Sequence, residues 1–149
     1  MPVAATSLNI VFASAEVAPF SKTGGLGEVL MSLPKALAAR GHNVSIFTPL
    51  YNCAWKAGLP IVPTDVKIET DVNGYRVAGR ICRSQLPGCD VPVYLVEHYD
   101  YFSRDDKLFG HTLYQFKATE GYMQDYSDND ARFVFFTRAI LEALPALGI

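Results

Sequence analysis

A glycine-rich run between a short apolar segment and an amphipathic segment constrains the fold of this chain most strongly. The run is residues 21–28 (SKTGGLGE), and it follows residues 8–14 (LNIVFAS), which have the length and apolarity of a buried strand. The apolar positions after the glycines recur with the spacing of one helix face, and they are Leu26, Val29, Leu30, Leu33 and Leu37. Gly41 is a favourable helix stop, and residues 43–49 (NVSIFTP) again have the character of a buried strand. This order predicts a right-handed βαβ unit with parallel strands.

The glycine-rich loop has the features of an anion site. A loop that opens a helix can bring bare backbone N–H groups to a negatively charged ligand, and the helix dipole favours the same charge. Glycine suits such a loop because a Cβ atom would hold the ligand away and disfavour positive φ values. Lys22 stands just before the glycines and can add a mobile positive charge. The run therefore predicts a phosphate or diphosphate site, although the glycines can instead serve only a tight turn and close helix–sheet packing.

Two familiar nucleotide motifs do not fit this run. A Walker loop places its lysine after the glycines, whereas Lys22 precedes them. The dinucleotide fingerprint needs a third glycine where Leu30 stands, and an acidic residue after the second strand, where the sequence continues with Pro49 and Leu50. These departures disfavour P-loop and NAD(P) chemistry.

Several runs of the sequence together form a recognisable pattern, and they are residues 15–29 (AEVAPFSKTGGLGEV), 33–37 (LPKAL), 49–51 (PLY) and 128–133 (DNDARF), with the short run RGH that ends the predicted helix. In these runs the chain resembles the bacterial glycogen synthases and plant-type starch synthases. The resemblance implies an α/β fold, namely the Rossmann-like parallel-sheet N-terminal half-domain of a GT-B glycosyltransferase with a β-hairpin insertion. It also implies transfer of glucose from ADP-glucose to the non-reducing end of an α-1,4-glucan, with retention of configuration.

The same resemblance assigns roles to single residues. Lys22 matches the lysine that contacts the phosphates of the donor, and Gly24 and Gly25 form the loop beside it. Further candidate substrate-binding residues are Glu16, Thr23, Glu28, Asn129 and Arg132. Glu28 stands where the family usually has Asp, so its carboxylate lies one methylene further out. For Asn129 and Arg132 two uses stay open, which are contact with the glucan and closure of a loop over the sheet.

The remaining segments predict further elements of an α/β domain. Residues 66–70 and 75–81 form a β-hairpin around an Asn-Gly turn, and residues 91–97 form another strand. Residues 100–109 are expected to be a loop in which Phe109 replaces the usual tyrosine of the family, so that Tyr114 or Tyr122 would have to supply a hydroxyl.

A last helix is predicted near the end of the chain. Ser127 or Asp128 is expected to cap it, with Asp130 in its first turn. Its apolar face is expected in the core and consists of Phe133, Phe136, Ile140 and Leu144.

Composition excludes several classes of protein. A net charge of −2 provides no basic face for nucleic acid, and no stretch approaches the ~20 apolar residues of a membrane span. The three cysteines and three histidines lack metal-ligand spacing, so we expect reduced thiols, no metal and no cofactor. Residues 1–7 lack the features of a signal peptide. We therefore expect a bacterial cytoplasmic protein, or a protein of the plastid stroma in a plant or alga.

The length of the chain sets a further expectation. Members of the family are roughly three times longer than these 149 residues. We expect residues 1–149 to be a single incomplete N-terminal domain that lacks the C-terminal nucleotide-binding domain, contains no catalytic residue and is inactive alone. Two alternatives stay open. One is a stand-alone, non-catalytic module that binds glucan or nucleotide sugar, and the other is a flavodoxin-like protein that binds sugar phosphates.

Overall fold

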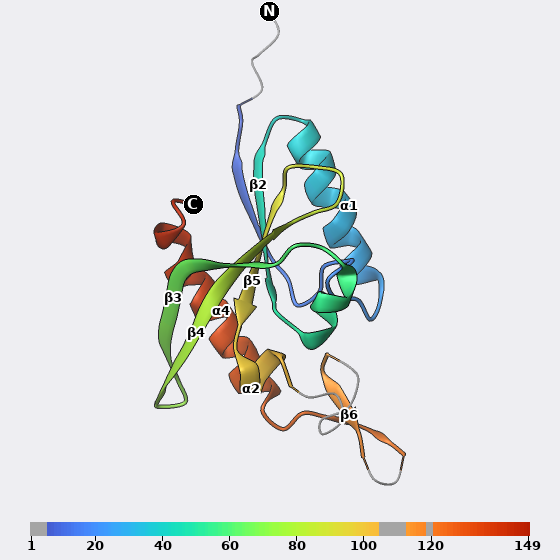
Figure 1. The fold of residues 1–149 in the computed structure, drawn as a ribbon, viewed down its shortest axis with the longest axis vertical. Helices are drawn as coiled ribbons and strands as arrows, with labels where there is room; N and C mark the ends of the chain where they lie inside the picture. Colours follow the sequence, from blue (N-terminus) through green and yellow to red (C-terminus); the bar gives the residue numbers. More distant parts are fainter. Residues whose placement is uncertain (1–5, 105–112, 119–120) are drawn as a thin grey trace, which may run out of the picture.

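The computed structural model describes residues 6–104, 113–118 and 121–149, and its centre is a five-stranded mixed sheet in the order β1-β2-β5-β4-β3 (Figure 1). Strands β1 (Asn9–Ala13), β2 (Asn43–Pro49) and β5 (Pro92–Glu97) run parallel to one another. Strands β4 (Tyr75–Gln85) and β3 (Val62–Val72) extend the sheet in antiparallel pairing. The predicted parallel sheet with a hairpin insertion is confirmed, and the hairpin joins the same sheet.

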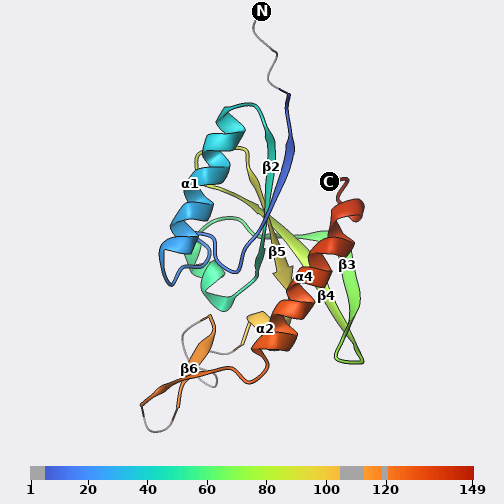
Figure 2. The same ribbon diagram turned by 180° about the vertical axis from the view of Figure 1, so that it is seen from behind.

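Two helices sandwich the sheet. Helix α1 (Gly25–Ala39) covers one face and helix α4 (Asn129–Ala146) covers the other (Figures 1 and 2). Neighbouring residues of each central strand point to opposite faces, and they divide the core in two. On the α1 side Leu30 packs with Ile46 and Leu95, and on the α4 side Phe135 packs with Phe47. Each such fully buried side chain stabilises the fold by about 1.5–3 kcal/mol relative to exposure.

Helix α1 lies where the sequence predicts it, but its buried face is different. The fully buried residues are Gly27, Leu30 and Pro34, whereas Leu26, Val29 and Leu33 are 43–51% exposed in the structure. The helix therefore packs against the rest of the protein with a narrow face that includes Gly27. The predicted stop is confirmed, because Gly41 takes a φ of 88° and its N–H donates to the Ala38 carbonyl.

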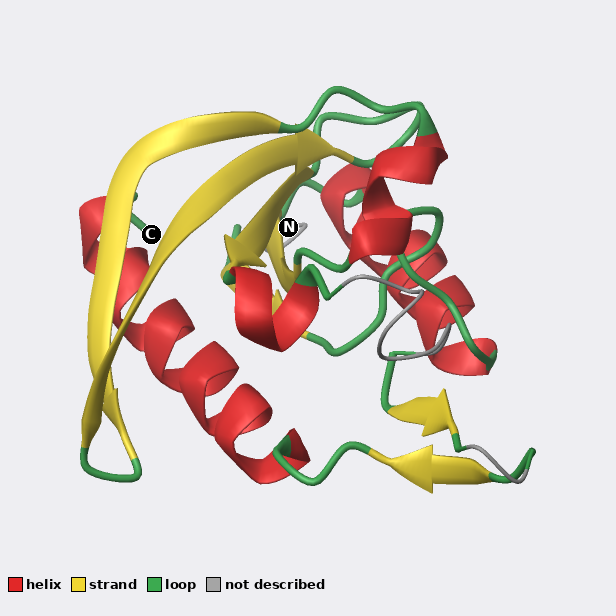
Figure 3. Cartoon of the chain, turned by 60° about the horizontal axis from the view of Figure 1, so that its bottom comes forward, coloured by secondary structure: helices red, strands yellow, loops and turns green. Residues whose placement is uncertain are grey.

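The β3–β4 hairpin is longer than predicted and curves over α4 (Figure 3). Its predicted turn is confirmed, since Asn73 and Gly74 both have positive φ, at 51° and 84°. Gly79 allows the close approach of α4, because a Cβ there would lie 2.8 Å from Phe135 Cζ and 2.7 Å from the Glu97 carbonyl oxygen.

Helix α4 begins as predicted after Asp128, but the carboxylate of Asp128 binds Arg104 and makes no capping hydrogen bond. Its fully buried face consists of Arg132, Phe135, Phe136, Ala139, Ile140 and Ala143. Of the predicted face, Phe136 and Ile140 are buried, whereas Phe133 and Leu144 are only partly buried at its border. The spacing of apolar residues alone does not show which of two neighbouring faces of this helix is buried.

Several short elements escape the sequence analysis. These are the 3₁₀ helix η1 (Asn52–Ala57), the short helix α2 (Tyr99–Phe102), and the two strands β6 (Gln115–Lys117) and β7 (Met123–Asp125), which form a separate small sheet. The predicted loop at residues 100–109 thus begins inside a helix, and Phe109 lies outside the described residues. In the part of the chain that the structure describes, none of the helices is long and apolar enough to cross a bilayer.

Candidate functional site

The glycine loop leaves the carboxyl end of β1 and enters α1. Ligands of open α/β sheets bind outside this edge, beyond the ends of the parallel strands. The backbone before the loop is fixed by the Ser21 N–H, which donates to the Val17 carbonyl at 2.9 Å, and by the Ala18 N–H, which donates to the Gly27 carbonyl at 3.1 Å. The loop is therefore held against the first turn of α1.

Gly24 and Gly25 have no packing role in the structure. A Cβ atom built on either glycine meets no atom within 4 Å, and neither has the positive φ that we expected, since Gly24 has a φ of −153°. The first N–H groups of a helix lack partners within the helix, and the Gly24 position supplies no side-chain cap. Packing therefore does not require glycine at either position, and both residues are exposed.

Gly27 is the glycine that packing requires. Its missing Cβ would lie 3.1 Å from the Ser21 carbonyl oxygen and 3.3 Å from Lys22 Cβ. The sequence analysis did not single out this glycine from the others in the run. Its small size brings the backbone of Lys22 against the first turn of α1.

Lys22 forms an ion pair with Glu28 at the start of α1. The Nζ atom of Lys22 bonds to Oε1 of Glu28, and the two side chains are 49% and 47% exposed. Exposed pairs of this kind contribute only about 0–1 kcal/mol. Because the pair is weak, an anion at the helix N-terminus can compete with Glu28 for Lys22.

Glu16 holds the loop from beneath. Glu16 is 4% exposed, and its carboxylate accepts hydrogen bonds from the Thr23 N–H and the Thr23 hydroxyl at 2.6 Å each, from the Tyr114 hydroxyl at 2.7 Å and from the Gly24 backbone. Burial raises the pKa of Glu16, but the hydrogen bonds from Thr23, Tyr114 and the Gly24 backbone together bring the pKa below its usual value. Glu16 is therefore an ionised support of the loop.

Arg132 and Asn129 hold the segment that carries Tyr114. The guanidinium of Arg132 is buried and donates to the Tyr101 and Leu113 carbonyls at 2.7 and 3.0 Å, and to Oδ1 of Asn129 at 2.6 Å. The Asn129 amide in turn donates to the Tyr114 carbonyl at 3.0 Å. Of the two uses left open, these contacts are those of loop closure.

The structure thus gathers the predicted residues in two groups. Residues 22–25 and Glu28 lie at the N-terminus of α1, with Glu16 beneath them, and Tyr114 connects Glu16 to the Asn129–Arg132 pair. Tyr114 was considered in the sequence analysis only as a replacement hydroxyl. A contact across 98 positions leaves no local signal in a single sequence. Tyr122, the other replacement considered, is 71% exposed.

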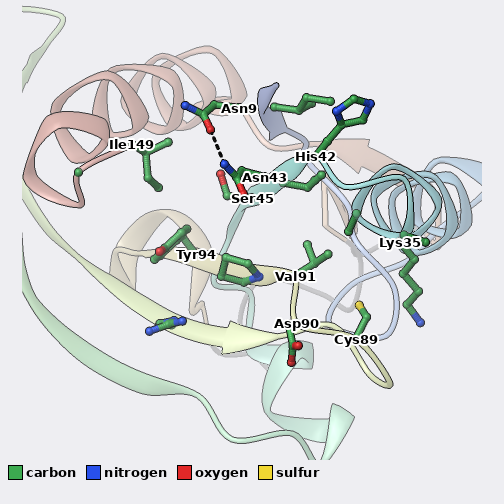
Figure 4. Close-up of a pocket in the computed structure, with 17 residues that line it drawn as sticks. Asn9, Lys35, His42, Asn43, Ser45, Cys89, Asp90, Val91, Tyr94 and Ile149 are labelled. Carbon is green, nitrogen blue, oxygen red and sulfur yellow. Dashed lines mark hydrogen bonds between the residues drawn. The ribbon is translucent and has the colours of Figure 1, made fainter. Parts of the chain in front are cut away.

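A separate hollow lies at the opposite edge of the sheet, beside the amino ends of the parallel strands (Figure 4). It encloses about 790 Å³, and the side-chain amide of Asn43 there donates to the side-chain Oδ1 of Asn9 at 2.9 Å. Its charged side chains are of both signs, including Lys35, Arg83 and Asp90. This hollow shares no residue with the glycine loop and takes no part in the site.

The described residues also contain no cluster of three or more His, Cys, Asp or Glu side chains that could hold a metal ion. All three cysteines lie within the described residues, and no disulfide joins them.

Comparison with known proteins adds an independent line of evidence. Residues 9–149 match the family model of the starch synthase catalytic domain. The chain belongs to this family. It is 39% identical over 137 residues to glycogen synthase 2 of Geobacter sulfurreducens, and 40% identical over 141 residues to a glycogen synthase of Syntrophotalea carbinolica. These alignments cover 92% and 95% of this chain, and 26% of each relative.

The fold agrees with the family. The structure is similar to the catalytic domain of starch synthase IV from Arabidopsis thaliana bound to ADP and acarbose, with a TM-score of 0.74 and 31% sequence identity. The match covers 96% of this chain and 26% of that chain. The expectation of a glucan synthase fold is confirmed, and the chain spans about a quarter of the length of these relatives.

Proposed function

We propose that this chain supplies the donor-phosphate loop of an ADP-glucose-dependent α-1,4-glucan glucosyltransferase. The observation that carries the proposal is the open backbone at Gly24 and Gly25, which the packing of the protein does not require, beside the exposed ammonium of Lys22. The ligands of the starch synthase IV structure, ADP and acarbose, support a diphosphate and a glucan as the partners. The partners that we propose do not include a nucleic acid or a membrane. We propose the bacterial cytoplasm as the location of the protein.

The chemistry of glucosyl transfer fits this loop. The bond between glucose C1 and the diphosphate oxygen breaks, the glucan 4-hydroxyl takes the glucosyl group, and negative charge develops on the departing ADP. Preorganised N–H groups of Gly25 and the following residues, with Lys22, stabilise that charge more strongly in the transition state than in the ground state. Loss of one such donor typically costs about 3 kcal/mol, or roughly a hundredfold in rate.

The other residues act on the loop. Glu16 fixes the backbone and hydroxyl of Thr23, and Asn129 with Arg132 fixes the segment of Tyr114. Glu28 holds Lys22 near the helix N-terminus until the diphosphate takes its place. We place the residues that activate the glucan hydroxyl outside residues 1–149.

Binding of ADP to this chain tests the proposal. In a titration followed by backbone amide NMR, ADP should shift the signals of Gly24, Gly25 and Leu26. Lys22→Ala should weaken binding at least tenfold, whereas Lys35→Ala, within α1 but at the other edge of the sheet, should leave it unchanged. If ADP shifts only signals far from the loop, the proposed site is wrong.

A further inference from the structure

A hollow beside the carboxyl ends of β2 and β5 has the character of a second ligand site. It encloses about 540 Å³, within the range of small-molecule sites, and none of the glycine-loop residues lines it. Its walls come from η1, which follows β2, from α2, which follows β5, and from β4. Because β2 and β5 are neighbours in the sheet, both connecting segments emerge at the same edge.

Two exposed aromatic rings line this hollow. Trp55 of η1 is 52% exposed and Tyr99 of α2 is 68% exposed. The rest of the aromatic cluster in this region is turned inward, since Phe102 is 3% exposed and packs against Tyr51. The apolar faces of exposed rings of this size stay in contact with water unless a ligand covers them. The flat face of a sugar ring, which carries C–H groups, is suited to that purpose.

The charged side chains that line the hollow sum to a net charge of zero. Arg80 donates to Oε2 of Glu97 from Nε at 2.7 Å and from Nη2 at 2.6 Å, so the cation and the anion neutralise each other. His98 accepts a hydrogen bond at Nδ1 from the Tyr101 N–H at 3.2 Å, and burial lowers its pKa, so the ring is neutral at pH 7. A phosphate would find no uncompensated cation on this wall, since the Arg80 guanidinium is held by two contacts to the Glu97 carboxylate.

The same groups offer both donors and acceptors. The guanidinium of Arg80 presents five N–H donors in a planar fork, of which the Glu97 contact uses two, and Glu97 brings a carboxylate acceptor. The two side chains are 43% and 29% exposed, so a ligand can reach them. Adjacent hydroxyl groups of a sugar, which both donate and accept, match this pair.

We propose that this hollow binds a segment of α-glucan, as a neutral chain of hexose rings stacked on Trp55 and Tyr99. The identity of the sugar rests on the proposed function, whereas the site itself is separate from the donor loop. A second contact with the polymer would keep the glucan bound to the protein between transfer steps.

Trp55 is the single tryptophan of the chain and therefore reports directly on the hollow. Addition of maltoheptaose should produce a saturable change in its fluorescence. Tyr99→Ala should weaken this binding about tenfold, as expected for removal of a central aromatic contact. The matched control is Tyr75→Ala, because Tyr75 is 76% exposed on the β3–β4 hairpin and does not line the hollow.

Further titrations separate this proposal from the proposed function. Lys22→Ala should leave the maltoheptaose response unchanged while it weakens ADP binding, and ADP should not change the Trp55 signal. A saturable response to maltoheptaose with no ADP binding at the loop would contradict the proposed function alone. Absence of a saturable response, a response equal to that of the β-linked cellohexaose, or full affinity in folded Tyr99→Ala would overturn the glucan site. In those cases Trp55 and Tyr99 would either contact a protein partner or be surface residues that bind no ligand.

Discussion

Replacement of Gly25 by alanine separates a glycine that serves a ligand from one that serves the fold. Gly25 is the first residue of α1, it does not have a positive φ, and a Cβ there meets no atom within 4 Å. At such a position Gly→Ala typically stabilises a protein by about 0.4–1 kcal/mol, because the unfolded chain loses freedom. For a domain of this size, the midpoint of thermal unfolding should rise by about 1–4 °C.

The effect on function should have the opposite sign. A methyl group at Gly25 would stand between the diphosphate and the N–H groups of α1, and loss of such contacts costs about 3 kcal/mol in the transition state. Under the proposed function, Gly25→Ala should therefore lower glucosyl transfer from ADP-glucose roughly a hundredfold. The two measurements are the melting curve of the variant and its initial rate at saturating glucan.

Gly27→Ala is the matched control within the same loop. A Cβ at Gly27 would lie 3.1 Å from the Ser21 carbonyl oxygen, so this variant should melt at a lower temperature than the parent protein. The reasoning is refuted if Gly25→Ala keeps full transfer activity, because the donor then does not approach this backbone. It is equally refuted if Gly25→Ala melts several degrees lower, because the loop conformation then requires glycine.

Three further predictions follow from the contacts of the site. Lys22→Ala should lower kcat/KM for ADP-glucose while glycogen binding, measured by affinity electrophoresis, stays unchanged; an unaltered kcat/KM would remove Lys22 from the donor site. Tyr114→Phe removes one hydrogen bond to the buried Glu16 carboxylate and should lower the free energy of unfolding in urea by about 1.5–3 kcal/mol; no change would show that this bond is absent in solution. His98 has a folded-state pKa below its ordinary 6.5, so the unfolded chain binds more protons and stability should fall as the pH falls below about 6.5. His98→Asn keeps a capping acceptor without titrating, and should reduce the loss of unfolding free energy between about pH 7 and pH 5.5; an equal loss in the variant would exclude His98 as its source.

The sequence predicts the framework of the fold because the framework depends on local signals. The strands around the loop are short and rich in apolar residues, and the hairpin turn is an Asn-Gly pair with the backbone angles that this pair favours. The helical period does not predict the buried side of α1, since Leu26, Val29 and Leu33 satisfy the period but are exposed. The burial of a helix face depends on what packs against it, and here the small Gly27 brings the loop close.

The site shows the same division. Lys22 and the glycines can be recognised because an anion needs a cation and bare N–H groups close together in the chain. The missing positive φ at Gly24 and Gly25 could not be foreseen, because the sequence pattern does not distinguish a glycine needed for its backbone angle from one needed for open space. Only the geometry makes that distinction, and it shows that neither packing nor a positive φ requires glycine at these two positions.

The support of the loop depends on contacts between distant parts of the chain. Arg132 of α4 binds Asn129, Asn129 binds the Tyr114 carbonyl, the Tyr114 hydroxyl binds Glu16, and Glu16 binds Thr23. Arg132 and Glu16 are buried, Asn129 and Tyr114 are partly buried, and Thr23 is exposed. The bonds of the series that involve a charged group contribute about 1.5–3 kcal/mol each. A donor loop must hold its N–H groups in position before the ligand arrives, because reorganisation during the reaction would reduce their effect on the transition state. If the proposed donor site is correct, the buried guanidinium of Arg132 supports it only through the series of side chains that ends at Thr23, because Arg132 is 2% exposed.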